Sequence, residues 1–396
     1  MVVCIPGLES IVGGELDALG VVHRPAGTGA LAARMTDRQL YLANAALGCA
    51  TRVLVDAGSF TARSFPALER GLADLDLGPW WTPEVPLRLR VTSRRSKLVH
   101  TGAVEERVRR VLGASDPAPG PRPTDPDGRA GAPGIPVHPG DGDRGPEQLL
   151  VVRIERDVVS VRVDSSGAPL HHRGWRGPQA KAPLRETIAR AALVAAGWRP
   201  GVALVDPFGG SGTIGIEAAR WAAGIAPGAD RSFAFADWPS FAPGTWASVH
   251  AALGGGPDAG TGDTAAAPIV VRDRDAGAVE AARENATRAG VGDRVEIDEG
   301  PISTLRPPEG SAPGLLVTNP PWGGRVRGGG DLRDVYARLG HVVRDRFPGW
   351  GMAVLTGDDR LAGATGLRPR RVALRARAGA HPIGLHVWRP DGDGHT

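Results

Sequence analysis

The alternation of strand and helix patterns in the second half of the chain is the feature that most constrains the fold. After residue 181, short apolar runs such as "VALVD", "PIVVRD", "LLVTN" and "MAVLT" are separated by helical segments. Strands that alternate with helices form parallel sheets, because each crossover helix covers one face of the sheet. One such helix, "AGAVEAARENATRAG", has Asp275 as its expected N-cap and Gly290 as its expected stop. The pattern predicts an α/β domain.

The first part of the chain predicts a different architecture. "VPLRLRVTSR" and "LLVVRIERDVVSVRVDSSG" alternate as strands do, and the segment 101–112 places Val104 and Val108 on one helical face. Between these elements, residues 113–148 are so rich in Pro, Gly and Asp that we predict a disordered insert. We therefore expect three parts in the chain: an α+β region over 1–167, an α/β domain over 168–390 and a disordered tail over 391–396.

Composition excludes several classes of protein. Of 47 basic residues only Lys97 and Lys181 are lysines, but arginine, alanine, glycine and proline are enriched together, as biased codon usage produces, so local clusters inform more than the total. Cys4 and Cys49 have neither disulfide nor zinc spacing, and the histidines give no metal site. We found no signal peptide pattern and no apolar run of about 18 residues, so we expect a cytoplasmic protein without a membrane span.

The stretch "VALVDPFGGSGTIGIEAAR" predicts a ligand-binding turn between a strand and a helix. Gly210, Gly212 and Gly215 satisfy GxGxxG, so a nicotinamide dinucleotide is the obvious competitor. That fingerprint expects a ribose-binding acid about 20 residues further on, whereas Asp273 ends a much later strand. Asp206, which precedes the glycines, suits the positive charges of S-adenosylmethionine better than a pyrophosphate. We therefore predict that cofactor, with Asp273 on its ribose; the bland alternative is a tightly packed turn.

The stretch "LLVTNPPWGG" predicts the catalytic centre. Asn319 follows a strand of the same sheet, so it should lie at the same edge as the glycine-rich turn. Its amide oxygen and the Pro320 carbonyl can accept hydrogen bonds from an exocyclic amine. These bonds would turn the amine's lone pair toward an electrophilic methyl group. Trp322 can stack on the base. The alternative is that the stretch is only a rigid turn.

Six segments, in this order, resemble the THUMP-domain RNA methyltransferases that modify the exocyclic amine of guanine in ribosomal and transfer RNA. They are "CIPGLESIVGGELDALG", "VTSRRSKLVHTGAVEERV", "LHHRGWRGPQAKAPLRETIARAALVAAGW", "DPFGGSGTIGIEAAR", "FADWPSF" and "NPPWGGRV". The resemblance covers nearly the whole chain. It implies a Rossmann-like class I methyltransferase domain with a seven-stranded sheet, preceded by an α+β ferredoxin-like plus THUMP module. We expect a monomer that binds structured RNA.

The resemblance also implies roles for individual residues. The cofactor-binding set is Asp206, Gly209, Gly210, Ser211, Gly212, Thr213 and Asp273, and the catalytic set is Asn319, Pro320, Pro321 and Trp322. Three departures stand out: Gly209 replaces the usual cysteine, Trp322 the usual tyrosine, and Pro301 the acid that usually contacts the adenine amine. We expect Glu299 or the Ile302 backbone to supply that last contact; the alternative is a weakened affinity for the cofactor. The long insert is not typical of the family.

A local excess of basic residues predicts the RNA-binding face, although a solvated charged face is the alternative. The proposed set is Arg88, Arg90, Arg94, Arg95, Lys97, Arg107, Arg109, Arg110 and, from "HHRGWR", Arg173. Two other functions stay open. The target could be an adenine amine in RNA or DNA, since the tetrapeptide accepts hydrogens from either base. Alternatively the chain could be an RNA-binding protein that has lost catalysis, as Pro301 and Gly209 would allow.

Overall fold

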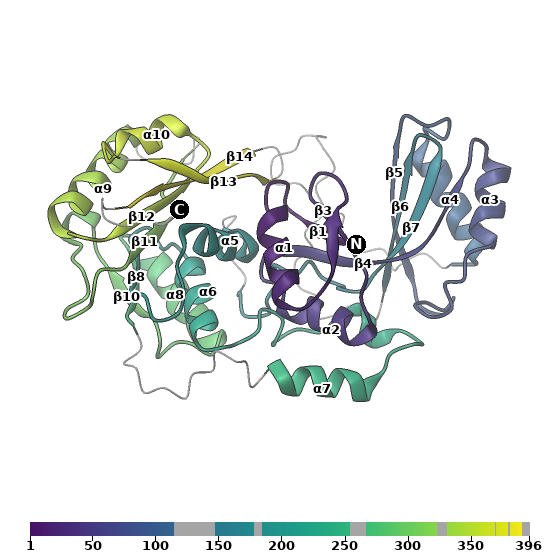
Figure 1. The fold of residues 1–396 in the computed structure, drawn as a ribbon, viewed down its shortest axis with the longest axis horizontal. Helices are drawn as coiled ribbons and strands as arrows, with labels where there is room; N and C mark the ends of the chain where they lie inside the picture. Colours follow the sequence, from purple (N-terminus) through teal and green to yellow (C-terminus); the bar gives the residue numbers. More distant parts are fainter. Residues whose placement is uncertain are drawn as a thin grey trace.

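The computed structural model describes residues 1–114, 147–177, 184–253, 267–322, 331–368, 370–378 and 381–389, and these form two seven-stranded sheets (Figure 1). The predicted insert 113–148 and the tail 391–396 lie outside the described residues, except for the ends of the insert. Gly113 ends a helix in a left-handed conformation, and Gln148 begins a strand. The predicted α/β architecture, with an α+β module in front, is confirmed.

The first sheet has the strand order β2-β3-β1-β4-β7-β6-β5. Its strands are β1 (Val2–Cys4), β2 (His23–Pro25), β3 (Ala30–Ala33), β4 (Ala50–Thr61), β5 (Leu87–Arg94), β6 (Gln148–Glu155) and β7 (Val158–Asp164). Its helices are α1 (Glu9–Ala18), α2 (Asp37–Ala46), α3 (Phe65–Ala73) and α4 (Thr101–Leu112). The long strand β4 pairs with β1 through its first part and with β7 through the rest, so it joins the ferredoxin-like part of the sheet to the part formed by β5, β6 and β7.

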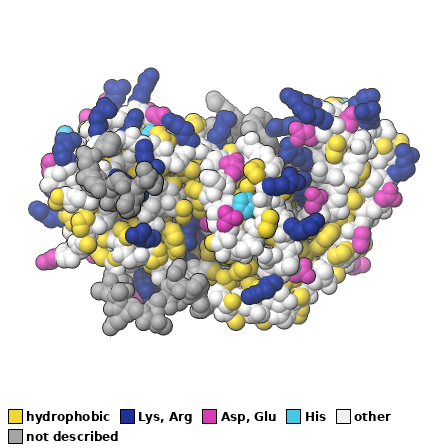
Figure 2. Space-filling view, in the orientation of Figure 1, with side chains coloured by type: hydrophobic (Ala, Val, Ile, Leu, Met, Phe, Trp, Pro, Cys, Tyr) yellow, Lys and Arg dark blue, Asp and Glu magenta, His cyan; other side chains and the backbone are white. Residues whose placement is uncertain are grey.

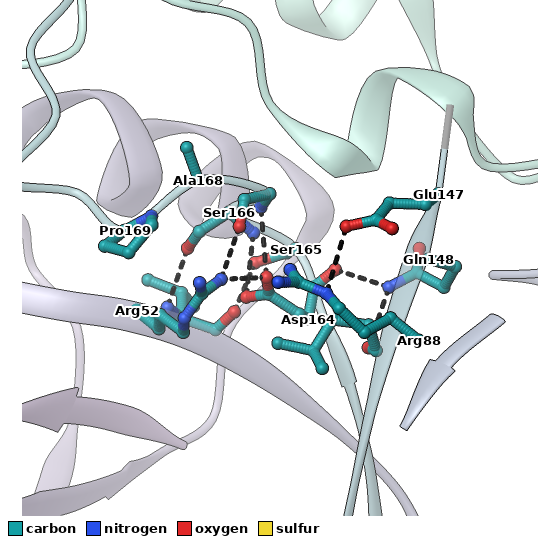
Figure 3. Close-up of polar contacts among 12 residues, drawn as sticks. Arg52, Arg88, Glu147, Gln148, Asp164, Ser165, Ser166, Ala168 and Pro169 are labelled. Carbon is teal, nitrogen blue, oxygen red and sulfur yellow. Dashed lines mark hydrogen bonds and ion pairs between the residues drawn. The ribbon is translucent and has the colours of Figure 1, made fainter. Parts of the chain in front are cut away.

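A buried polar network fixes the chain where it leaves this sheet (Figure 3). Arg52 on β4 donates hydrogen bonds to the Asp164 carboxylate and to the Gly167 carbonyl. Asp164 is fully buried, and burial raises the pKa of its carboxyl although Arg52 opposes the shift. The Asp164 carbonyl also accepts a hydrogen bond from the Gln148 side chain at 2.9 Å. A buried charge pair of this kind holds its surroundings in one arrangement, because breaking it would leave an uncompensated charge.

The second sheet has the order β10-β9-β8-β11-β12-β14-β13, in which β14 alone runs antiparallel to the other six strands. Its strands are β8 (Leu204–Asp206), β9 (Ile269–Asp273), β10 (Glu296–Glu299), β11 (Leu315–Thr318), β12 (Gly351–Thr356), β13 (Arg371–Ala378) and β14 (His381–Trp388). The helices are α5 (Glu186–Ala196), α6 (Thr213–Ala222), α7 (Pro243–Leu253), α8 (Ala276–Arg288), α9 (Leu332–Arg346) and α10 (Asp359–Ala364), with 3-10 turns at Ala234–Asp237 and Ile302–Thr304. The strand order reverses direction between β8 and β11, and such a switch point is where ligands bind in open α/β sheets.

The two halves of the chain pack closely against each other. Helix α7 lies along α2 of the first half (Figure 1), and Tyr41 stacks on Phe235 with ring centroids 4.4 Å apart. On the other side, the Pro6 carbonyl accepts a hydrogen bond from the Arg377 amide at 3.1 Å. Gly7 has φ +98°, and a Cβ there would lie 1.9 Å from the Arg375 carbonyl oxygen. Only glycine therefore allows this loop to reach β13.

Two absences apply to the described residues. None of their helices is long and apolar enough to cross a membrane. Among the same residues, no group of three or more His, Cys, Asp or Glu side chains is arranged to hold a metal ion.

Candidate cofactor and catalytic site

The glycine-rich turn connects β8 to α6 and leaves space for a ligand. Gly212 is the N-cap of α6 at φ +83°, and Gly210 has φ +51°. A Cβ added at Gly210 would meet no atom within 4 Å, so this part of the turn faces open space. The opposite holds at Gly209, where a Cβ would lie 2.3 Å from a Val271 methyl group. The cysteine expected at this position would require Val271 to move.

Asp206 ends β8 as a buried carboxyl without a cationic partner among the described residues. It is 1% exposed, and burial raises its pKa to about 7. The Thr318 hydroxyl donates a hydrogen bond to its Oδ1 at 2.6 Å, and the Phe208 amide donates another at 3.3 Å. These bonds lower the pKa, while nearby Asp273 raises it. Such a carboxyl suits a ligand that brings its own positive charge, as the amino group of S-adenosylmethionine does.

Asp273 ends the neighbouring strand β9, close to the same turn. Its Oδ2 accepts a hydrogen bond from the Gly210 amide at 2.9 Å, and its Oδ1 accepts one from the Asp275 amide at 3.1 Å. A carboxylate oxygen has two lone pairs, so both oxygens can still accept a hydroxyl. The ribose role stays a prediction, and the carboxylate also ties the turn to β9.

Glu299 and Ile302 lie beyond the end of β10, beside Asp273. Glu299 is exposed and pairs in register with Asp273, and its side chain forms no hydrogen bond or ion pair with the described residues. Ile302 begins a 3-10 turn, where the first amides have no partner within the turn. Pro301 precedes it and is exposed. Both proposed contacts to the adenine amine stay predictions.

Arg176 is a residue of this site that sequence reasoning did not select. Its guanidinium donates to Ser211 Oγ at 3.1 Å and to Thr213 Oγ1 at 2.9 Å, and pairs with the buried Glu186 at 2.7 Å. It comes from the segment that links the two sheets, so that segment supports the turn. The Ser211 and Thr213 hydroxyls are therefore partly occupied, and their predicted cofactor contacts fall mainly to their backbone amides. The sequence signal that could have identified Arg176 is its position in "HHRGWRG", the same basic segment from which Arg173 was selected.

The predicted catalytic tetrapeptide follows β11, which pairs with β8. Asn319 is half-buried and comes directly after Thr318, the partner of Asp206. Its Oδ1 accepts a hydrogen bond from the Trp322 indole at 3.0 Å. The indole lies against the loop after β12, where a Cβ added at Gly357 would be 2.5 Å from the ring. Pro320 is buried and Pro321 is half-buried. Packing of the prolines and the bond between Asn319 and Trp322 together fix the turn.

The predicted RNA-binding residues separate into two groups. Those held by the protein itself include Arg88, which pairs with Glu147 at 3.0 Å (Figure 3), and Arg109, which donates to the Leu87 carbonyl at 2.7 Å. Half-buried Arg90 and Arg107 belong with them, the latter 3.8 Å above the Phe65 ring. The exposed members are Arg94, Arg95, Lys97 and Arg110, the last paired with Glu69 at 2.8 Å. RNA contacts by the exposed members stay predictions.

The burial of Arg173 contradicts the prediction that this residue contacts RNA. It is 1% exposed, and its guanidinium donates to Glu217 at 3.2 Å, to the Leu170 carbonyl at 2.7 Å and to the Gly48 carbonyl at 2.6 Å. A guanidinium whose donors are all directed inward has no surface to offer a phosphate. Arg173 instead fastens the first half of the chain to α6.

Comparison with known proteins agrees with this architecture. Residues 173–382 match the family model "RMKL-like, methyltransferase domain", and residues 1–54 match "RlmL ferredoxin-like domain". The chain is 31% identical to a putative RNA methyltransferase of Synechocystis sp. over 91% of this chain and 89% of that protein.

Two further comparisons set the scope of the match. The ribosomal RNA large subunit methyltransferase K/L of Pseudomonas putida is 31% identical over 93% of this chain, but the chain spans only 49% of that protein's length. A solved structure from Listeria monocytogenes, described as a predicted N6-adenine-specific DNA methylase, superposes with a TM-score of 0.80 over 98% of this chain and 95% of that one, at 26% identity. The chain belongs to the RMKL-like methyltransferase family, and an RlmL-type ferredoxin-like domain precedes its methyltransferase domain.

Proposed function

We propose that this enzyme methylates the exocyclic amine of a guanine in structured RNA, with ribosomal RNA as the first candidate. The observation that carries the proposal is the position of Asn319. It follows β11 at the strand-order switch point, and its neighbour Thr318 is hydrogen-bonded to Asp206 beside the cofactor turn. A hydrogen-bond acceptor for an amine and a carboxylate for a cationic cofactor therefore lie next to each other.

Each residue has a distinct task in the proposed mechanism. Asp206, the backbone of the glycine-rich turn, Asp273 and Glu299 hold S-adenosylmethionine, which supplies an electrophilic methyl group when bound. Asn319 Oδ1 and the Pro320 carbonyl each accept a hydrogen bond from one of the two amine N–H groups. These two bonds fix the orientation of the amine's lone pair. Trp322 stacks on the base. Because no strong base is needed to hold a neutral amine in place, the contribution of these residues is mainly orientation.

The choice of RNA rests on two arguments. The relatives with curated names act, by those names, on RNA or on large-subunit ribosomal RNA. The chain also has exposed basic residues at the end of β5 and just after it, namely Arg94, Arg95 and Lys97. In Figure 2, Lys and Arg side chains gather along one edge of the molecule, over the region of β5 to β7 and again over α10 and β13. Such a distribution favours a long polyanion.

The test is methyl transfer to unmodified RNA. Ribosomal and transfer RNAs transcribed in vitro are incubated with isotopically labelled S-adenosylmethionine, and the nucleosides are analysed by mass spectrometry. We expect labelled N2-methylguanosine, and we expect Asn319→Ala to remove it while calorimetry still shows cofactor binding. Transfer by Asn319→Ala at the wild-type rate would contradict the assigned mechanism.

The adenine amine is the second candidate, because the Listeria monocytogenes protein is described as a predicted N6-adenine-specific DNA methylase. The same experiment, extended to DNA, separates the two through labelled N6-methyladenine. Tight RNA binding without any cofactor binding would instead favour a homologue that has lost catalysis.

A further inference from the structure

A cleft of about 500 Å³ lies between the two halves of the chain, outside every residue assigned above. One wall is the loop of Pro6 and Gly7 in the ferredoxin-like part. The opposite wall is formed by the loop after β12, the start of α10 and the β13–β14 hairpin. The lining residues from that wall include Gly357, Asp358, Asp359, Arg360, Arg375 and Arg377.

The cleft adjoins the proposed base-binding residue. Gly357 lines it, and the Trp322 ring packs on Gly357 so closely that any side chain there would collide with the indole. Trp322 also makes an edge contact with His381, which precedes the lining residue Pro382. A base stacked on Trp322 therefore has this cleft beside it, and the nucleotides on either side of the base need a place to lie.

The charges in the cleft leave two arginines available. Asp358 caps α10 through the Arg360 amide at 2.8 Å, and Asp359 pairs with Arg375 at 3.0 Å and with buried His386 at 3.0 Å. Both acids are thus engaged. Arg360 and Arg377 are exposed, and their guanidinium groups form no ion pair or hydrogen bond with the described residues. Asp358 keeps its negative charge, because a backbone amide does not neutralise it, so the lining carries three arginines against two acids and its net charge is +1.

The walls of the cleft are fixed relative to each other. On β13 the buried residues Leu374 and Ala376 alternate with the exposed Arg375 and Arg377, so the strand's packing fixes the face that the arginines occupy. The Arg377 amide is itself hydrogen-bonded to the Pro6 carbonyl. The cleft is therefore part of the folded core of the enzyme rather than a gap between loose domains.

We propose that this cleft binds the sugar-phosphate backbone of the RNA next to the target nucleotide, with Arg360 and Arg377 as the phosphate contacts. The inference rests on the proposed function, because it assigns part of the same RNA substrate. A cleft of this volume lies in the range that holds small ligands, so it can accept about one nucleotide. Guanidinium groups bind phosphate oxygens through paired hydrogen bonds. Holding a flanking phosphate compensates part of the free energy lost when a base leaves its stack.

The test compares two double variants that remove equal charge from the methyltransferase half. Arg360→Ala with Arg377→Ala removes both unpaired arginines from the cleft. Arg294→Ala with Arg338→Ala is the matched control, since both residues are exposed and unpaired among the described residues. Binding of unmodified large-subunit ribosomal RNA is measured by filter retention over a series of salt concentrations, and cofactor binding by calorimetry.

We expect the cleft variant to bind RNA at least about tenfold more weakly and its salt slope to fall by about one per arginine, while the control stays near wild type. Cofactor affinity should be unchanged in both. Equal RNA affinity and salt slope in the cleft variant and the control would overturn the inference, as would a wild-type protein that binds no RNA. RNA binding without methyl transfer to any RNA would instead refute the proposed function, and the cleft comparison would still give its answer.

Discussion

The Thr318 hydroxyl donates a hydrogen bond of 2.6 Å to the Asp206 carboxylate, from a position 112 residues further along the chain. Thr318 is the last residue of β11, and Asp206 is the last of β8. The bond joins the cofactor turn to the peptide that begins at Asn319. The two proposed binding sites are thus coupled through one buried contact.

We predict that Thr318→Val weakens cofactor binding about tenfold at pH 7. Valine keeps the shape but removes the donor, so the carboxylate form of Asp206 loses a hydrogen bond of the stronger, charge-assisted kind. The pKa of Asp206 should rise further, and the ionised form should become rarer. Calorimetric titration with S-adenosylmethionine measures the effect. Thr287→Val is the control, because the Thr287 hydroxyl only bonds to its own helix; equal affinities in the two variants would contradict the coupling.

We predict that cofactor affinity rises with pH between about 6 and 8. The pKa of Asp206 is raised to about 7 by burial, so the free protein loses this proton within that window. The cofactor's amino group pairs only with the ionised carboxylate, and affinity should therefore increase through pH 7 and level off above it. Dissociation constants at a series of pH values test this. A flat profile would indicate that Asp206 does not face a cationic group.

Asp206 should also oppose folding at alkaline pH. A carboxyl whose pKa is higher in the folded state than in the unfolded chain binds its proton more tightly when folded. Its contribution to stability therefore falls as pH rises from about 4, the unfolded value, to about 7, the folded one. We predict that Asp206→Asn, measured without cofactor, unfolds at a higher temperature than wild type at pH 8 and loses this advantage at pH 4. Cofactor binding by the same variant should be strongly reduced.

The positions of the strand ends could be predicted from the sequence. Parallel strands place their carboxyl ends at one edge, so residues that end buried runs, such as Asp206, Asp273 and Asn319, were expected together. The structure brings Asp206 and Asp273 to the glycine-rich turn and connects Asn319 to them through Thr318. The local sequence pattern suffices here, because the geometry of a parallel sheet brings the carboxyl ends of its strands to one edge.

Burial of charge could not be predicted in the same way. Arg173 looks like any arginine in a basic segment, but its partners Glu217 and the Gly48 carbonyl lie 44 and 125 residues away. The free arginines of the cleft were missed for a related reason. Because arginine is abundant throughout the chain, nothing in the sequence distinguishes Arg360 and Arg377 from other arginines. Their cleft forms only because the Pro6–Gly7 loop packs on β13.

We predict a graded loss of methyl transfer at Trp322. Tyrosine, the usual family residue, should retain most activity, phenylalanine about a tenth, and alanine less than about a hundredth, because base stacking contributes about 1–3 kcal/mol. The phenylalanine variant keeps a ring but lacks the indole donor that holds Asn319 Oδ1. Single-turnover rates with saturating cofactor measure the series, and calorimetry should show unchanged cofactor affinity. Full activity in Trp322→Ala would refute the stacking role.

We predict that replacing Arg94, Arg95 and Lys97 together by alanine weakens RNA binding and lowers its salt slope by up to about three. These residues are exposed at the end of β5 and just after it, so the folded state should be unaffected. The matched control replaces the exposed residues Arg24, Arg34 and Arg38 of the ferredoxin-like part. Filter binding at several salt concentrations distinguishes the sets, and an equal loss in both would indicate only a general attraction between charges.

Arg173→Ala should destabilise the protein without changing its RNA contacts. Removing one partner of a buried ion pair leaves Glu217 charged and uncompensated, at a cost of about 3–5 kcal/mol. Thermal unfolding should shift downward accordingly, whereas RNA affinity, measured at a temperature where the variant is folded, should stay within about twofold of wild type. A double variant, Arg173→Met with Glu217→Leu, removes both charges and should recover part of the stability. It cannot recover all of it, because the Leu170 and Gly48 carbonyls also lose their donors. If the Arg173→Ala protein were as stable as wild type but bound RNA weakly, Arg173 would be an RNA contact after all, in contradiction to its burial.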